Sequence, residues 1–218
     1  TFDGEGSLHS ITSGKPITST LTKILLGTNN MGKVQEFLTL MGGLRFTITT
    51  PNEEGISFDV EENGENYHEN AYIKAQAFSK ASGLTTVADD SGLEVEALGG
   101  EPGLRSARYA GLDATDKDRV SYLLDKLNGI GWEYRKARFI CVIALVEPNG
   151  EPKYFDGICE GKITLEPKGD GGFGYDPIFY IPSIGKTVAQ LSQRQKNNIS
   201  HRSIAAKKLL AHLKLLDI

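Results

Sequence analysis

One segment limits the possible folds more than any other. Residues 137–146, ARFICVIALV, are almost all apolar, which is typical of a strand buried on both faces of a sheet. The sequence EPNGEP follows directly, and its Asn149-Gly150 pair is typical of a tight hairpin turn. We therefore expect a second strand, near residues 154–160, to pair antiparallel with the first.

The rest of the chain alternates between strand and helix patterns. Thr115 with Asp118 three residues later resembles a capping box and predicts the start of a helix, with Gly129 as its stop. Hairpins and crossovers together predict an α/β fold with a mixed sheet. The expected strands are 23–27, 46–49 and 86–89, and the other expected helices are 30–41, 66–81 and one from about Ser200 whose apolar stripe is Ala205, Leu209, Leu213 and Leu216.

Charge and composition exclude several classes of function. The formal net charge of the 218 residues is −4, so the overall positive field that dominates nucleic-acid binding is absent and we expect a small-molecule partner. Cys141 and Cys159 are too few for a disulfide framework, and no apolar stretch is long enough for a membrane span. Without a secretory signal pattern, a cytoplasmic protein is expected. Residues 1–22 are interpreted as a disordered leader or an added tail, which leaves a single domain over 23–218.

The turn after the first expected strand has the sequence GTNNMGKV. It resembles a phosphate-binding loop, but Val34 stands where that motif needs a hydroxyl for magnesium. A strand that opens into a helix still directs backbone N–H donors and the positive end of the helix to one point, which favours phosphate. A plain strand-to-helix turn, with Asn30 as N-cap and Lys33 in solvent, fits the pattern equally well.

Two adjacent carboxylates, Asp89 and Asp90, follow the apolar residues of the third expected strand. Acids beside a core are unfavourable unless cations or hydrogen bonds compensate them. Successive strand residues point to opposite sides, so one carboxylate is expected to face an active-site metal while the other anchors a turn at Ser91-Gly92 through backbone N–H groups. An Asx-type turn with two exposed acids is the alternative.

A glycine-rich loop, PKGDGGFGYDPIFY, combines flexibility with aromatic rings and an acid. Its glycines allow the backbone to approach a ligand, and Phe173 or Tyr175 offers a face on which a nucleobase can stack. Packing of both rings within the loop itself is the alternative.

A basic segment, RQKNNISHRS, precedes or opens the last expected helix. Lys196, His201 and Arg202 are cations near a helix N-terminus, where the helix dipole favours anions. An anionic or carbonyl-bearing ligand would resolve this conflict, whereas a solvated basic cluster is the alternative.

Taken together, the segments TNNMGKVQE, ENAYIKA, ADDSGLEVEALGGEPGLRSARYAG, GFGYDPIF and KNNISHR resemble the inosine triphosphate pyrophosphatase family, in order and over nearly the whole chain from Lys23. The resemblance implies an elongated mixed β-sheet with helices that form two lobes around a central cleft, and a homodimer. It also implies Mg²⁺-dependent hydrolysis of ITP, dITP and XTP to the nucleoside monophosphate and pyrophosphate, which cleanses the nucleotide pool.

The same resemblance assigns roles to individual residues. Asp90, as the proton acceptor, and Lys33 would be catalytic, and Glu62 and Asp90 would hold Mg²⁺. Donors from His201 or Arg202 that face purine O6 would accept hypoxanthine or xanthine and reject adenine. The nucleotide would be bound by Thr28, Asn30, Lys33, Lys74, Ser91, Phe173, Gly174, Tyr175, Asp176, Lys196, His201 and Arg202.

The chain departs from the family pattern in two places, and two other functions remain open. Gln190 stands where relatives commonly have Glu, and Tyr67-His68 replaces the usual Thr-Phe before Glu69-Asn70-Ala71, which bears on the placement of Glu62. A P-loop-type phosphotransferase would account for GTNNMGK and TTVADD. A nucleotide- or RNA-binding module would account for the aromatic-glycine loop and SHR.

Overall fold

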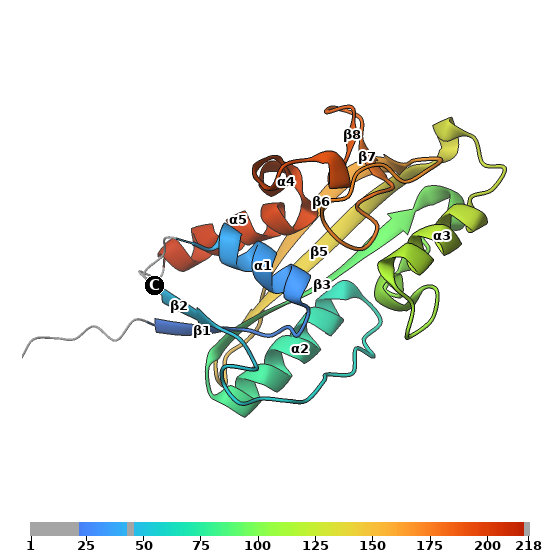
Figure 1. The fold of residues 1–218 in the computed structure, drawn as a ribbon. Coiled ribbons are helices and arrows are strands. Elements are labelled where there is room, and N and C mark those ends of the chain that lie inside the picture. The colour runs from blue at the N-terminus through green and yellow to red at the C-terminus, as the bar shows by residue number, and fades with distance from the viewer. Residues whose placement is uncertain (1–21, 43–45, 216–218) are drawn as a thin grey trace, which may run out of the picture.

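The computed structural model describes residues 22–42 and 46–215 (Figure 1). An 8-stranded mixed sheet has the order β2-β1-β3-β5-β6-β7-β8, with β4 paired to β3. β1 is parallel to β2 and β3, and the other strand pairs are antiparallel. The strands are β1 (Thr22–Leu26), β2 (Phe46–Thr49), β3 (Thr85–Val95), β4 (Pro102–Gly103), β5 (Lys136–Val146), β6 (Lys153–Ile163), β7 (Phe179–Ile181) and β8 (Lys186–Thr187).

Helices cover both faces of this sheet. In Figure 1, α1 and α5 lie on one side of β1, β3 and β5, and α2 lies on the other. Short 3₁₀ turns, η1 to η4, connect the remaining elements. The helices are α1 (Met31–Leu40), α2 (Tyr67–Ser82), α3 (Asp116–Lys126), α4 (Gln193–Ile199) and α5 (His201–Leu215), and the 3₁₀ turns are η1 (Glu96–Leu98), η2 (Ser106–Arg108), η3 (Trp132–Tyr134) and η4 (Val188–Gln190).

The prediction of a central hairpin is confirmed. β5 pairs antiparallel with β6, and the turn between them is closed by a hydrogen bond from Gly150 N to Glu147 O (2.9 Å) with Asn149 at φ 63°. Burial on both faces holds only from Cys141 onward, because Lys136 and Arg138 are exposed. The buried half lies between α5 and α2, and the other half reaches beyond both helices.

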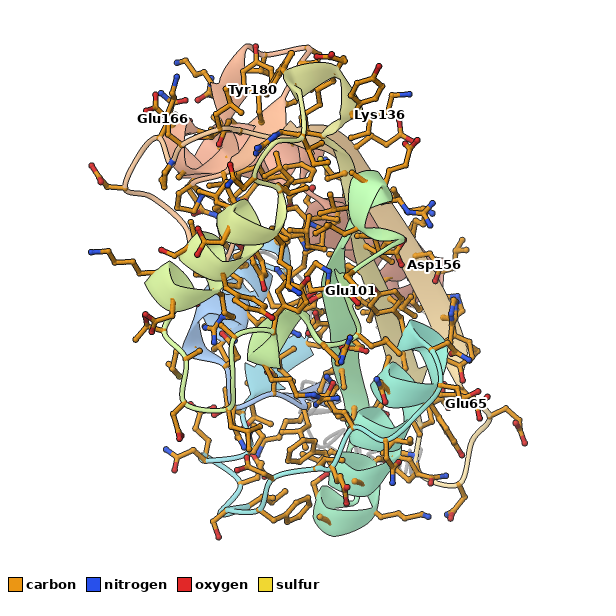
Figure 2. All side chains as sticks on the ribbon, turned by 90° about the vertical axis from the view of Figure 1, so that its right-hand side faces the viewer. Glu65, Glu101, Lys136, Asp156, Glu166 and Tyr180 are labelled. Carbon is orange, nitrogen blue, oxygen red and sulfur yellow. The ribbon has the colours of Figure 1, made fainter. Side chains whose placement is uncertain are left out.

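The core divides into groups that correspond to two lobes. Around β1, α1 and α5 the core includes Phe37 and Leu209, and α2 packs on the opposite face through Ala71 and Ala75. A separate group around α3, β6 and β7 includes Phe179. Figure 2 shows the resulting elongated shape, with Lys136 and Tyr180 near one end and Glu65 toward the other. The expected two-lobed mixed sheet is confirmed.

The third strand is longer than the sequence analysis expected. β3 continues through Asp89, Asp90, Ser91 and Gly92 and pairs with β5 from Thr86 to Val95. The predicted turn at Ser91-Gly92 is therefore wrong. Polar side chains can remain in this buried strand because Lys33, Lys74 and Arg202 from other elements compensate Asp89 and Asp90.

Helix starts follow the capping patterns closely. Asn30 and Asn66 cap α1 and α2, and Thr115 with Asp118 forms the predicted capping box of α3. The apolar stripe of α5 is confirmed at its three described members, whereas Leu216 and all predicted leader residues except Thr22 lie outside the described residues. Thr22 itself belongs to β1.

A short helix before α5 was missed. α4 spans seven residues without a helical apolar period, so only its Ser192 cap could have indicated it. Lys196 consequently lies in the last turn of α4, where the helix dipole favours a cation, rather than at the start of the final helix. The predicted dipole conflict is thus wrong for Lys196.

We expect Gly157→Ala to destabilise the protein. A Cβ on Gly157 would collide with the carbonyl oxygen of His201 and lie 2.6 Å from Ala205 N, so α5 would have to move off β6. Overpacking of this kind costs about 1–3 kcal/mol, which a urea unfolding curve can measure. Gly42→Ala is the control, since its nearest contact would be an ordinary 3.5 Å to Leu38 O. Equal stability of the two variants would contradict the close helix-strand packing.

Candidate active site

A cavity of about 410 Å³ lies between the two lobes. Segments from both lobes line it: the turn between β1 and α1, residues 59–62, α2, β3, η2, α3, the loop 173–176, α4 and α5. Every residue to which the family resemblance assigned a role lines this cavity, namely Thr28, Asn30, Lys33, Glu62, Lys74, Asp90, Ser91, Phe173, Gly174, Tyr175, Asp176, Lys196, His201 and Arg202.

The turn between β1 and α1 places polar groups at one end of the cavity. Thr28 Oγ1 accepts a hydrogen bond from Asn30 N (3.2 Å), and Asn30 Oδ1 accepts one from Lys33 N (3.1 Å). The Lys33 ammonium is mostly buried, 3.0 Å from Asp89 Oδ2. Burial, opposed by Asp89, lowers the pKa of Lys33 from its usual value. The alternative of a solvated Lys33 is therefore wrong.

The two adjacent carboxylates of β3 point to opposite sides, as predicted. Asp89 is buried at 1% exposure and does not line the cavity, and its Oδ2 lies 3.1 Å from Arg202 Nη2. Burial alone would raise the pKa of Asp89, but Lys33 and Arg202 outweigh it and hold that pKa well below its usual range. Asp89 therefore anchors two cations, not a turn as predicted.

Asp90 faces the cavity and has a different environment. Its Oδ1 accepts a hydrogen bond from Ser91 N (2.9 Å), and its Oδ2 accepts one from Asn70 Nδ2 (3.1 Å). Lys74 Nζ lies 3.9 Å from Asp90 Oδ1 and 3.0 Å from Glu62 Oε1. Burial raises the pKa of Asp90 to about 6, with Lys74 opposing the shift and Glu62 adding to it.

Changing the charges around Asp90 is expected to move its pKa in opposite directions. In the metal-free protein, Glu62→Gln should lower it, because a neighbouring negative charge is lost, and Lys74→Met should raise it. NMR titration of the carboxyl carbon measures both shifts. Since Asp90 binds a proton more tightly in the folded state, its contribution to stability should fall as pH rises from about 4 to about 6. Shifts of the same sign in both variants would contradict this electrostatic account.

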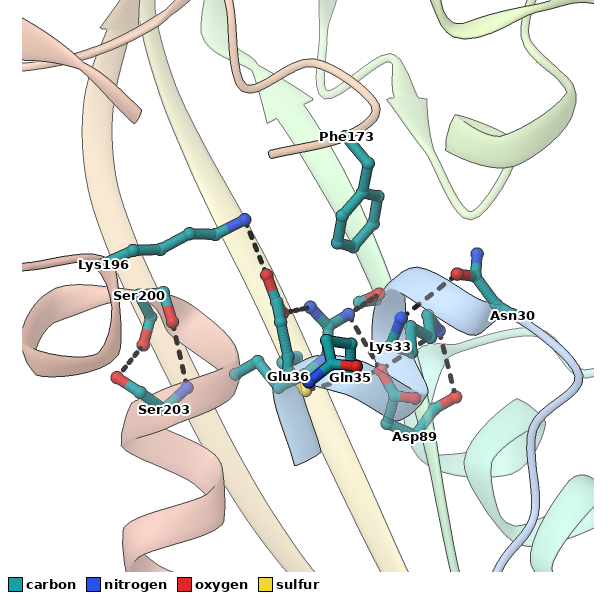
Figure 3. A network of polar contacts seen from close by, with 12 residues as sticks. Asn30, Lys33, Gln35, Glu36, Asp89, Phe173, Lys196, Ser200 and Ser203 are labelled. Carbon is teal, nitrogen blue, oxygen red and sulfur yellow. Dashed lines mark hydrogen bonds and ion pairs between the residues drawn. The ribbon is translucent and has the colours of Figure 1, made fainter. Parts of the chain in front are cut away.

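Buried charges form an alternating network that continues from Lys33 and Asp89 to Arg202 and beyond (Figure 3). Glu36 accepts from Arg202 Nη1 (2.5 Å), and its other oxygen lies 2.6 Å from Lys196 Nζ. Lys196 Nζ also lies 2.6 Å from Asp176 Oδ2. The protein's own carboxylates thus compensate Arg202 in the first turn of α5, without the ligand that the sequence analysis invoked.

Glu36 was missed by the sequence analysis. It is only 7% exposed, on the same side of α1 as the buried Phe37, and it does not line the cavity itself. A charged residue next to the apolar positions of a helix was the available signal, since a carboxylate is rarely buried without a partner.

Aromatic rings surround this charged network. Lys196 Nζ lies 4.9 Å from the centre of the Phe173 ring, and Arg202 Cζ lies 5.8 Å from it. His201 stacks on Phe139 with ring centres 4.7 Å apart. Burial, together with Arg202 and Lys196, lowers the pKa of His201 well below its usual value, so the imidazole is neutral and has one N–H donor.

The loop that carries Phe173 is held by several other elements. Asp176 Oδ2 accepts from Phe173 N (3.0 Å), and Asp116 Oδ2 of α3 accepts from Gly174 N (2.7 Å). The buried Tyr175 hydroxyl donates to Ser106 O (2.8 Å). These bonds fix the loop across the cavity and exclude the alternative of a loop packed only on itself. Cavity-lining side chains that the sequence analysis did not single out include Asp59, Ser106, Arg108, Asp116, Arg119 and Phe139.

The two departures from the family pattern lie outside the cavity. Gln190 Oε1 accepts from Thr187 N (3.0 Å) and so closes a capping box at η4. Tyr67 OH contacts Glu94 (3.3 Å), and His68 pairs with Asp156 on the surface. Neither substitution reaches Glu62, which remains against Lys74.

Two carboxylates in the cavity can share a metal ion with a bound ligand. Glu62 and Asp90 both approach Lys74 Nζ, and the residues described contain no group of three or more His, Cys, Asp or Glu side chains positioned to hold a metal. Mg²⁺ is usually held by one or two carboxylates together with phosphates and water. This pair therefore fits Mg²⁺ brought in with a phosphate-bearing ligand better than it fits a permanently bound ion.

The fold and the site together define a class. The protein is a mixed α/β protein with a lysine- and carboxylate-rich cleft between two lobes, large enough for a small molecule. Within the described part of the chain, no helix has the length and apolar character to cross a membrane.

The chain belongs to the Ham1 family, whose model matches residues 24–212. It is 48% identical over 185 residues to a dITP/XTP pyrophosphatase of Halalkalibacterium halodurans. The matched stretch covers 85% of this chain and 95% of the relative. It is 46% identical to the dITP/XTP pyrophosphatase of Thermus thermophilus over 86% of this chain and 90% of the relative. Among solved structures, the Ham1 protein of Staphylococcus aureus matches with a TM-score of 0.80 and 44% identity, over 88% of this chain and 98% of that one.

Proposed function

We propose that this protein hydrolyses ITP, dITP and XTP to the nucleoside monophosphate and pyrophosphate with the help of Mg²⁺. The observation that carries this proposal is the convergence of Lys33, Asp90 and the loop 173–176 on one cavity. The relatives named dITP/XTP pyrophosphatase support the substrate class. A homodimer, as the family resemblance implies, and a cytoplasmic location are proposed with it.

The formal charge of the cavity supports a requirement for a divalent cation. Six cationic side chains line the cavity, against five carboxylates that line it and two more, Glu36 and Asp89, that pair with these cations from behind. The wall therefore does not carry a surplus of positive charge for a triphosphate. Mg²⁺ supplies that charge when bound, polarising phosphate oxygens and acidifying its water. Glu62 and Asp90 would hold it.

The protein's own groups would bind the phosphates and accept the proton of the attacking water. Thr28, Asn30 and the N-terminus of α1 would bind phosphate oxygens, and Lys33 and Lys74 would neutralise them. Asp90 would accept the proton of the water that attacks the α-phosphorus. The bond to the bridging oxygen then breaks, and pyrophosphate leaves with the electron pair.

The other end of the cavity would recognise the base. Phe173 would stack on the purine, and donors from neutral His201 or Arg202 would face O6 of hypoxanthine or xanthine. Adenine has an amino group at this position, so a buried donor would lose its partner, a penalty of about 1–3 kcal/mol.

Product analysis across ITP, XTP, dITP, GTP and ATP tests this function. With Mg²⁺, we expect IMP and pyrophosphate from ITP, and at least about tenfold lower kcat/KM for ATP because of the unpaired donor. Orthophosphate and a diphosphate, or transfer of the γ-phosphate to an acceptor, would instead indicate the P-loop alternative. Salt-sensitive RNA binding without turnover would indicate the binding-module alternative.

A further inference from the structure

Two arginines that line the cavity come from η2 and α3. Arg108 ends η2, and Arg119 lies in α3. The family resemblance gave neither of them a role. Their surroundings differ in a way that separates a structural arginine from one available to a ligand.

Arg119 is engaged within the protein through both terminal nitrogens. Its Nη1 donates to the carbonyl oxygens of Ala107 (3.0 Å) and Ala114, and its Nη2 pairs with Asp116. Asp116 in turn accepts from Gly174 N. Arg119 therefore ties η2 and α3 to the loop that carries Phe173, and its donors are directed at these partners.

Arg108 has no such partners. It is exposed and lines the cavity, and among the described residues its side chain makes no ion pair and no hydrogen bond. The other cations that line the cavity, Lys33, Lys74, Arg119, Lys196 and Arg202, each pair with a carboxylate within the described part of the chain. Arg108 is thus the cavity cation whose charge nothing in this part of the chain offsets.

The backbone of Arg108 is nevertheless held in place. Ser106 Oγ accepts from Leu93 N (2.9 Å) and donates to Gly103 O (2.6 Å), and Ser106 O accepts from the Tyr175 hydroxyl. Leu93 is three residues after Asp90 on β3. A rigid turn beside the catalytic strand therefore presents a free guanidinium to the cavity.

The chemistry of the cavity indicates what this guanidinium binds. Phe173, His201 and Arg202 are assigned to the base, and the two terminal nitrogens of Arg202 already pair with carboxylates. The base is uncharged, so the triphosphate is the part of a nucleotide that an exposed cation without a carboxylate partner attracts. A planar guanidinium suits phosphate, which it can bind through two parallel hydrogen bonds.

We propose that Arg108 binds the β- and γ-phosphates of the substrate, the part that leaves as pyrophosphate. This inference rests on the proposed function and adds a residue for the leaving group. The guanidinium donates hydrogen bonds and transfers no proton. It counters the negative charge that moves onto pyrophosphate as the bond to the α-phosphorus breaks.

Inhibition by the two products separates this proposal from other roles. In Arg108→Ala we expect the inhibition constant of Mg²⁺-pyrophosphate to rise by about tenfold or more, as for a lost charge-assisted hydrogen bond. The inhibition constant of IMP should stay within about twofold of its value in the unaltered protein. The value of kcat/KM for ITP should fall by about the same factor by which the inhibition constant of pyrophosphate rises. Arg108→Lys should restore part of the loss, because it keeps the charge but not the two parallel bonds.

Arg105→Ala is the matched control, three residues earlier on the same segment. Arg105 is exposed, pairs with Glu101 (3.5 Å) and does not line the cavity, so its removal should change neither constant. Unchanged pyrophosphate inhibition in Arg108→Ala, or equal weakening of IMP and pyrophosphate, would overturn the proposal. If the unaltered protein forms no IMP from ITP, the proposed function fails as well, which is a distinct result.

Discussion

Asp90→Asn is expected to lower kcat for ITP by about 10²–10⁴-fold, the range for loss of a general base, while the protein still folds and binds nucleotide. The amide cannot accept the proton of the attacking water and is a poor ligand for Mg²⁺. The fold should tolerate the change, because the charge that burial disfavours at Asp90 is removed. Steady-state kinetics with a fluorescence or calorimetric binding assay separates turnover from binding.

Asp59→Asn is the control for Asp90→Asn. Asp59 is another carboxylate of the same cavity, but it accepts from Asn29 Nδ2 (2.9 Å) and has no ion pair with Lys74. We expect kcat to change less than about tenfold in this variant, since no proton transfer is lost. Unchanged turnover in Asp90→Asn would remove Asp90 from the mechanism.

Arg202→Met is expected to have the largest effect on stability. Arg202 is 2% exposed and pairs with both Glu36 and Asp89, so its removal leaves two buried carboxylates short of a partner. Breaking a buried ion pair in this way typically costs about 3–5 kcal/mol, which urea unfolding can resolve. Lys196 and Lys33 remain as partners, which places the expected loss at the lower end of that range.

Arg138→Met is the matched comparison on the surface. Arg138 pairs with Glu94 at 2.7 Å, but its side chain is 52% exposed, so we expect a loss of only about 0–1 kcal/mol. If Arg202→Met cost no more than Arg138→Met, the buried network would not be what holds α5 against α1 and β3.

Most of the fold could be predicted because local patterns and tertiary packing agree. The apolar run of β5, the turn at Asn149 and the caps at Asn30 and Thr115 all predicted elements close to those observed. The turn expected after Asp90 was wrong for a physical reason. Local sequence shows two acids and a glycine, whereas Lys33 and Arg202, distant in sequence, allow the strand to continue.

The candidate site, like the fold, could be predicted only in part. Residues such as Lys33 and Phe173 were identified because their segments resemble a known family, and they meet at one cavity. Glu36 and Asp116 were missed, because the sequence does not show which distant cation or backbone N–H will pair with a carboxylate on a helix. The ion pairs that connect the two ends of the cavity arise only from the fold.

The position of water attack tests the central claim most directly. ITP hydrolysed with Mg²⁺ in H₂¹⁸O can be followed by ³¹P NMR, in which ¹⁸O shifts the resonance of the phosphorus that it joins. If Asp90 activates water beside the α-phosphorus, the label will appear in IMP and the pyrophosphate will be unlabelled. Label in pyrophosphate or orthophosphate would contradict the account.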